Sequence, residues 1–210
     1  MLIPSFENKF DGVVWNTIVS NDGELLIVDI REEEKKLVKY FKLDLTNFEL
    51  SPLNIGNASW WSKMESYTGD LFVSQYQDKN DPNNKIFYRL AADSREEVSA
   101  ADILSSELAI VQPSVYEPQS DYFKMVSDFL GLDLGCSCEY LEWSDKIILS
   151  YYLRSGKVFD RQLLVLHEGK KVLKELQDVE MKGFASGAFF VLNHKLFFVK
   201  NRNEIFVYSV

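Results

Sequence analysis

Short apolar runs alternate with polar turns along most of the chain. The runs mix β-branched and aromatic residues, whereas the breaks are rich in Gly, Asn, Asp, Ser and Pro, as in residues 21–23, 81–84, 154–156 and 201–203. Apolar runs of this kind, bounded by residues that favour turns, are typical of β-strands joined by tight connections. The pattern predicts a fold built mainly from antiparallel strands.

The most regular part of this pattern spans residues 61–92. It reads as a strand that starts at Trp61, a turn at Gly69, an apolar strand, a polar loop and a second apolar strand. The same order follows Trp15, and the spacing from Trp15 to Gly23 equals the spacing from Trp61 to Gly69. The sequence is therefore expected to contain structural repeats.

Aligning the turns gives five copies of the repeat. Their anchor positions are Gly23, Gly69, Ser106, Asp145 and His194. The anchors are about 43 residues apart on average, which is the period of a four-stranded propeller blade. The apolar runs after the anchors are nearly continuous, as expected for strands that are covered on both faces by neighbouring blades. We predict one all-β domain over residues 1–210, a β-propeller of about five blades with three to four antiparallel strands each.

The last repeat lacks one strand, and the N-terminal residues can supply it. The fifth copy ends at Val210, directly after its third strand, and the residues before the first copy have no other assignment. Residues 2–6 are expected to supply the missing outer strand. Pairing of the N-terminal strand with the last blade would close the ring and remove open sheet edges.

Three segments also fit helices. Residues 94–108 open with the Ser-x-x-Glu pattern of a capping box, and residues 120–130 have helical spacing and end at Gly131, a typical C-terminal residue. Residues 170–177 are ambiguous between strand and helix. The alternative to an all-β propeller is therefore an α+β fold with short helices within residues 94–130.

The composition of the chain excludes several classes of binding partner and location. With 210 residues, 46% of them hydrophobic, the chain can bury a core without disulfides or a metal. Acidic residues outnumber basic ones by 32 to 23, so nucleic acids and anionic membranes are not expected as partners. The N-terminal residues do not resemble a signal peptide, and no apolar run approaches the ~20 residues of a membrane span. A cytoplasmic location is expected.

Two segments carry a resemblance to a known family. Trp15 with Gly23-Glu-Leu-Leu-Ile-Val, and Trp61 with Gly69-Asp-Leu-Phe-Val-Ser, resemble the blade consensus of quinoprotein-like β-propellers. The chain looks like a small bacterial propeller in this respect. It departs from more specific patterns, because it lacks the Trp-Asp dipeptide, the paired glycines of kelch blades, the sialidase box and a quinone-binding constellation. The resemblance implies a fold and no activity or cofactor.

The adjacent tryptophans Trp60 and Trp61 are the first candidate binding residues. Neighbours on a strand point to opposite faces, so the two indoles cannot occupy the same core position. If Trp61 packs between blades, as Trp15 is expected to do, Trp60 lies at a rim, where it could stack on a sugar or on a partner's side chain. The alternative is that both indoles are buried against different blades.

Carboxylates on the first strands of blades are the next candidates. Such strands line a propeller's channel, which would bring Asp11, Glu65, Glu139 and Glu142 near its axis. A glycosidase needs two carboxylates on either side of the scissile bond. The alternative is that acidic residues fall on these strands by chance, since the chain has 32 of them. Trp143, beside Glu142, is a further candidate for ligand contact.

The remaining motifs do not indicate a cofactor. Cys136 and Cys138 are too far apart on a strand for easy disulfide formation, and neither His167 nor His194 has a companion at the spacing of a zinc site. Two reduced thiols, no metal and no cofactor are expected. No phosphate-binding loop or nucleophile motif is present, so no catalytic residue is assigned.

We therefore expect a non-enzymatic binding or scaffold module that recognises a protein or a small ligand on one face of the propeller. Two alternatives remain open. One is a carbohydrate-active enzyme that works through channel carboxylates such as Glu65 and Glu142. The other is lectin-like sugar binding through Trp60.

Overall fold

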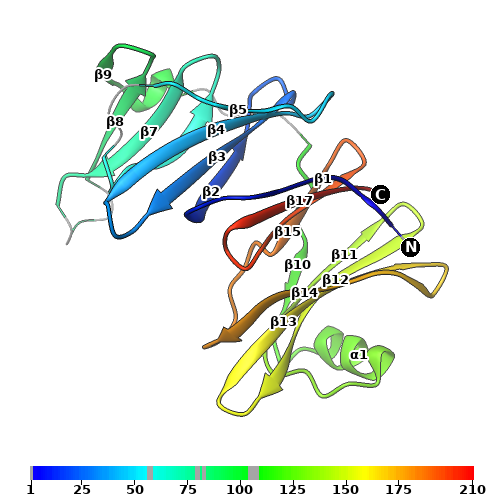
Figure 1. Cartoon of the computed structure of the whole chain (residues 1–210). Coiled ribbons are helices and arrows are strands. Elements are labelled where there is room, and N and C mark those ends of the chain that lie inside the picture. Colours follow the sequence, from blue (N-terminus) through cyan, green and yellow to red (C-terminus); the bar gives the residue numbers. More distant parts are fainter. Residues whose placement is uncertain (1, 56–58, 79–80, 82–83, 104–108) are drawn as a thin grey trace. The chain divides into compact units, whose positions relative to one another are not determined.

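The structure is a computed structural model that describes residues 2–55, 59–78, 81, 84–103 and 109–210. The described residues form four antiparallel sheets and one α-helix. The chain divides into two compact units (Figure 1). Unit 1 combines Met1–Lys9 with Ile110–Val210, and unit 2 comprises Phe10–Ala109.

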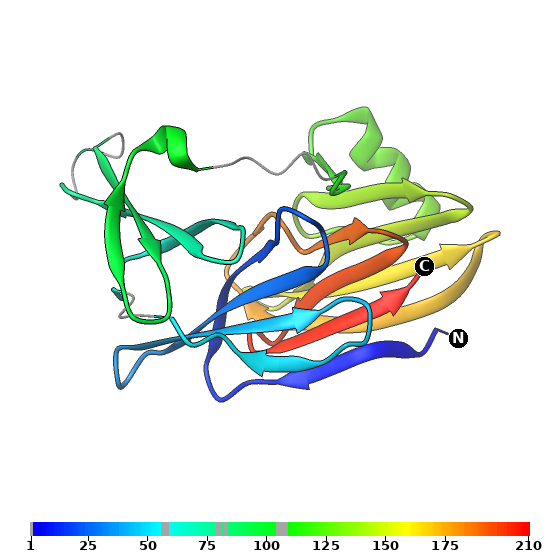
Figure 2. The same ribbon diagram turned by 90° about the horizontal axis from the view of Figure 1, so that it is seen from above.

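Unit 2 contains two four-stranded sheets in which every strand pairs with the next one in sequence (Figure 2). The strands are β2 (Val13–Val19), β3 (Leu25–Glu32), β4 (Leu37–Asp44), β5 (Leu50–Pro52), β6 (Lys63–Tyr67), β7 (Leu71–Tyr76), β8 (Lys85–Leu90) and β9 (Arg95–Val98). The turns expected at Gly23 and Gly69 are present. Both glycines have a positive φ, of 78° and 103°, which L-residues with a side chain rarely adopt.

The two sheets of unit 2 share an apolar core. Its buried members include Ile27 of β3, Tyr40 of β4, Met64 of β6, and Leu71 and Val73 of β7. Because side chains alternate between the two faces of a strand, these residues mark the faces on which the sheets pack.

Unit 1 contains the other two sheets, a five-stranded one in the order β10-β11-β12-β13-β14 and a four-stranded one in the order β1-β17-β16-β15. The strands are β1 (Pro4–Lys9), β10 (Ser114–Tyr116), β11 (Cys138–Trp143), β12 (Lys146–Ser155), β13 (Val158–His167), β14 (Lys170–Met181), β15 (Phe189–Leu192), β16 (Lys195–Lys200) and β17 (Glu204–Ser209). The N-terminal strand β1 pairs antiparallel with β17, so the first residues supply the outer strand of the last sheet.

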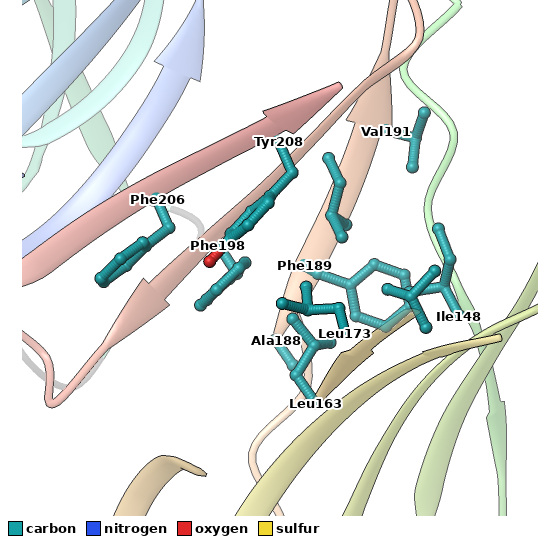
Figure 3. Packing of buried hydrophobic residues seen from close by; sticks show 11 residues of the cluster. Ile148, Leu163, Leu173, Ala188, Phe189, Val191, Phe198, Phe206 and Tyr208 are labelled. Atoms are coloured by element: carbon teal, nitrogen blue, oxygen red, sulfur yellow. The ribbon is translucent and has the colours of Figure 1, made fainter. Parts of the chain in front are cut away.

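The five-stranded sheet is covered on both faces. On one face, Leu163 and Leu173 pack with Phe189, Phe198 and Tyr208 of the four-stranded sheet (Figure 3). The opposite face packs against α1 (Asp121–Leu130), whose buried residues join those of β12 and β13 in a second cluster. The nearly continuous apolar runs of β12 and β13 are thus covered on both faces, as expected, but one of the covers is a helix and not a neighbouring sheet.

The number of sheets and the third repeat differ from the sequence prediction. The described residues form four sheets rather than five. The expected third copy does not form a blade, because its strand at 122–126 lies within α1, while residues 104–108 lie outside the described residues. The helix forms because the Ser120 side chain accepts a hydrogen bond from the Phe123 N–H, and Gly131 ends the helix with φ of 64°.

The other ambiguous segments are resolved differently. Residues 95–98 form strand β9, followed by a short 3-10 turn at Ala100–Asp102, so the capping-box pattern at 94–97 does not start an α-helix. Residues 170–177 belong to strand β14. None of the helical segments in the described part of the chain has the length and apolar character that a membrane crossing requires.

Candidate functional site: an aromatic recess beside the helix of unit 1

Helix α1 has more apolar surface than its packing on the sheet uses. Phe123 and Val126 are buried against the sheet. Tyr122, Met125 and Phe129 are 62%, 64% and 57% exposed. These three residues are spaced three and four positions apart, so they share one side of the helix. The helix therefore presents a second, uncovered apolar stripe.

This stripe forms one wall of a surface recess of about 280 Å³, which we call the aromatic recess. The other wall is the sheet formed by β10, β11 and β12. The lining residues are Tyr116, Tyr122, Met125, Val126, Phe129, Tyr140, Glu142 and Ile147. Small-molecule and side-chain binding sites are typically concave and apolar with a few polar groups, and the recess has this composition.

Three tyrosine rings meet in the recess, where Tyr116 contacts each of the other two. The Tyr116 ring is stacked with the rings of Tyr122 and Tyr140, with centroid distances of 5.1 Å and 5.6 Å and interplanar angles of 19° and 29°. Tyr116 and Tyr140 are brought together by strand pairing, because Tyr116 of β10 lies opposite Cys138 of β11, two residues from Tyr140. Tyr122 comes from the first turn of α1.

Among the described residues that line the recess, Glu142 is the one with a charged side chain. Its carboxylate accepts a hydrogen bond from the Tyr140 hydroxyl, two residues away on the same face of β11. Burial and the neighbouring Glu142 raise the pKa of Tyr140, so that the hydroxyl keeps its proton and remains a donor. Among the described residues, no basic side chain forms an ion pair with Glu142.

Glu139 has a different environment from Glu142. It is 1% exposed, and its carboxylate accepts hydrogen bonds from the backbone N–H groups of Gly187 (2.6 Å) and Ala188 (3.0 Å). Burial raises the pKa of Glu139, while these N–H groups and Arg161 oppose the shift. The residue ties β11 to the chain just before β15. Three positions separate it from Glu142, so the two carboxylates leave a regular strand on opposite faces and do not form an acid–base pair.

The environment of Glu139 predicts that the stability of the protein depends on pH. A carboxyl whose pKa is raised on folding binds more protons in the folded state, so its contribution to stability falls as pH rises from the ordinary value of 4.5 through the raised pKa. Glu139→Gln should remove this dependence. Urea unfolding at several pH values should show wild type gaining stability relative to the variant as pH is lowered through this interval. A constant difference between the two proteins would contradict the assignment.

Trp143 belongs to the same unit as the recess. Its indole packs against the apolar core between the two sheets, 5.6 Å from the His194 ring between ring centroids. The buried Nε1 has no hydrogen-bond partner within the described residues. Trp143 does not line the aromatic recess, so the structure separates it from its neighbour Glu142.

The tryptophans of unit 2 are arranged differently from the sequence prediction. Trp61 and Trp15 were expected to pack inside, but they are 77% and 54% exposed, whereas Trp60 is partly buried. Trp15 lies at an irregularity between β2 and β3, where Val14 and Asn16 pair with consecutive residues of β3. This bulge changes the direction of the Trp15 side chain relative to a regular strand.

Trp15 and Trp60 both contact the cation of Arg31. The guanidinium carbon lies 4.5 Å and 5.6 Å from the two ring centroids, within the range of cation–π attraction. Arg31 also donates hydrogen bonds to both carboxylate oxygens of Asp29 and to the backbone oxygens of Trp60 and Ser62. The Trp60 ring is further covered by the Lys36 ammonium, at 4.6 Å. The visible role of Trp60 is thus to enclose a buried ion pair.

The contacts of the Glu65 side chain lie within its own sheet. Its carboxylate accepts a 2.6 Å hydrogen bond from the Ser74 hydroxyl and lies 3.7 Å from the Lys63 ammonium. It belongs to unit 2, whereas Glu139 and Glu142 belong to unit 1.

The two cysteines are unpaired thiols. Cys138 is buried, and its burial raises its pKa to about 11, so the thiol is protonated at neutral pH. Within the described ranges, no group of three His, Cys, Asp or Glu side chains is arranged to hold a metal ion.

The sequence prediction included Glu142 but missed the three tyrosines around it. The sequence contains a signal for the recess, because residues 120–130 have helical spacing and end at Gly131. Tyr122, Met125 and Phe129 fall on one side of that helix, and Phe123 and Val126 on another. The apolar face of this segment is therefore wider than the packing of a short helix on a sheet requires, and this width was the signal that the sequence offered.

Comparisons with known proteins add little. No family model matches the chain, and no curated protein sequence matches it. The solved structures that show similarity include the β-propeller domain of the trilobed protease from Pyrococcus furiosus, with 12% identity and a TM-score of 0.26 over 94% of this chain. They also include the acylaminoacyl peptidase from Pyrococcus horikoshii, with 9% identity and a TM-score of 0.23 over 94% of this chain. The chain spans 55% and 38% of the lengths of these two structures. Similarity at this level carries no argument about function.

Proposed function

We propose that the chain is a non-enzymatic binding module, and that the aromatic recess is its binding site. The observation that carries this proposal is the exposed side of α1, where Tyr122, Met125 and Phe129 face solvent next to stacked tyrosines. Contiguous exposed apolar surface is costly in water and commonly marks an interaction site. Aromatic residues and Met are also enriched at the centres of protein interfaces.

We further propose that the four sheets are propeller blades carrying this site. The arrangement of the last sheet supports this assignment, since its strand order β1-β17-β16-β15 takes the outer strand from the N-terminus. The sheets of unit 2 are meanders of four consecutive strands, which is the usual composition of a blade. The scaffold would hold the recess on a rigid surface.

A triple variant tests the recess as a binding site. Peptides are selected from a random display library on the wild-type protein, and their affinities are measured for Tyr122→Ser/Met125→Ser/Phe129→Ser. Selected peptides should bind this variant at least about tenfold more weakly, because exposed apolar anchors dominate the binding energy of such sites. The three side chains are exposed, so folding should be retained, as checked by circular dichroism.

A matched control is available on the same unit. Leu176 of β14 is 43% exposed and does not line the aromatic recess. Leu176→Ser should bind the selected peptides as wild type does. Equal affinities for wild type and the triple variant would place the binding surface elsewhere and overturn the proposal.

A further inference from the structure

We propose that the occupant of the aromatic recess is a basic segment of a partner protein, with the cation of an Arg or Lys side chain at Glu142 and its alkyl chain against the tyrosine rings. This inference rests on the proposed function of the recess. It assigns the chemistry of the ligand, which the proposed function leaves open.

The first argument is the state of the Glu142 carboxylate. It lies in a recess that is otherwise lined by aromatic and aliphatic side chains, and it accepts a hydrogen bond from the Tyr140 hydroxyl. No ion pair to it is present among the described residues. A carboxylate forms its strongest hydrogen bonds with cationic donors, and the faces of tyrosine rings attract cations as well. Both features of the recess therefore favour a positively charged group.

The second argument is the charge of the surrounding chain. Residues 116–147 contain all lining residues of the recess. This segment has seven acidic residues and two basic residues, an excess of 7 − 2 = 5 negative charges out of the chain's net −9. The acidic residues are Glu117, Asp121, Asp128, Asp133, Glu139, Glu142 and Asp145, and the basic residues are Lys124 and Lys146, of which Lys146 is paired with Asp145. Such a concentration of one sign attracts basic partners and repels acidic ones.

The third argument separates a protein segment from a small cation. The exposed side chains of Tyr122, Met125 and Phe129 are separated by seven residue steps from first to last, which corresponds to roughly 10 Å along the helix. A small ammonium ion would contact only one end of this stripe. A peptide with alternating basic and apolar side chains can place a cation at Glu142 and apolar groups along α1, so it would use the whole surface.

The test uses three peptides of about 12 residues, a length that can span such a helical groove. One alternates arginine with leucine, and in the others every arginine is replaced by glutamine or by glutamate. Dissociation constants are measured by fluorescence anisotropy with the full chain, with Glu142→Gln and with Glu34→Gln. Glu34 lies in an exposed turn of unit 2, so its replacement removes one charge without touching the recess.

The arginine peptide should bind wild type about tenfold more tightly than the glutamine peptide, and the glutamate peptide should bind least. Glu142→Gln should weaken the arginine peptide about tenfold and leave the glutamine peptide unchanged, as expected for one charge-assisted contact. Glu34→Gln should leave all three affinities unchanged within about twofold.

Three results would overturn this inference. Equal affinities of the glutamine and arginine peptides, both weakened in the Tyr122→Ser/Met125→Ser/Phe129→Ser variant, would leave the recess as a binding site, but not one for cations. Equal losses from Glu142→Gln and Glu34→Gln would show attraction by net charge alone. Displacement of the arginine peptide by an equal concentration of tetramethylammonium would assign the recess to a small cation. If the proposed function itself is wrong, the Tyr122→Ser/Met125→Ser/Phe129→Ser variant will bind every peptide as tightly as wild type does. This outcome differs from the three above.

Discussion

Replacing Asp29 by alanine is expected to lower the free energy of unfolding by about 3–5 kcal/mol. The side chains of Asp29 and Arg31 are 0% and 4% exposed, and they form a bidentate ion pair that uses both carboxylate oxygens. Removing the carboxylate leaves a buried guanidinium without its counter-charge. Its remaining hydrogen bonds to backbone oxygens do not neutralise it. Urea unfolding followed by tryptophan fluorescence measures the loss directly, since Trp15 and Trp60 contact Arg31.

Two further variants test whether the stability loss of Asp29→Ala comes from the broken ion pair or from a general packing defect. Asp29→Leu combined with Arg31→Met replaces the ion pair by apolar groups, and it should recover much of the stability that Asp29→Ala loses. Glu34→Ala removes an exposed carboxylate from the same unit and should change the unfolding free energy by no more than about 0.5 kcal/mol. A loss below about 1 kcal/mol for Asp29→Ala would show that the buried pair is not formed as described.

Phe189→Ala is the second change with a large expected effect, a loss of about 3–5 kcal/mol. Phe189 is 1% exposed and packs with Leu163 and Leu173 between the two sheets of unit 1 (Figure 3). Truncation of its ring leaves a cavity that the surrounding strands cannot fill, because each is held in register by its neighbours. Thermal and urea unfolding of the full chain measure the effect.

Two control variants test whether the loss depends on the size of the side chain at position 189 and on the burial of the ring. Phe189→Leu keeps most of the apolar volume and should cost less than about 1.5 kcal/mol. Phe129→Ala removes the same ring from the exposed side of α1 and should leave stability within about 0.5 kcal/mol of wild type. Equal losses at positions 129 and 189 would contradict the assignment of one residue to the core and the other to a binding surface.

Much of the strand pattern was predictable from local chemistry. The turns at Gly23 and Gly69 require a positive φ, and the apolar runs beside them form β3 and β7. The helix at 120–130 was also identifiable from Ser120 and Gly131 at its ends. The repeat alignment predicts a strand at 122–126, but the capping at Ser120 and Gly131 stabilises the helix.

The exposed tryptophans show what local chemistry does not determine. Side-chain direction along β2 follows from regular alternation only where pairing is regular, and the irregularity at Trp15 breaks it. The position of Trp60 depends on Arg31, which is 29 residues away in sequence. The recess likewise requires Tyr116, Tyr122 and Tyr140 to be brought together from two strands and a helix, so it was visible only once the packing of α1 on the sheet was known.

The most direct measurement of the central claim uses the methionine methyl groups as reporters. The chain has four methionines, of which Met125 lines the recess and Met64 is buried in unit 2. In protein labelled at methionine methyl carbons, titration with the arginine–leucine peptide should shift the NMR signal of Met125 and leave that of Met64 in place. A bound peptide that leaves the Met125 signal unmoved would contradict the account.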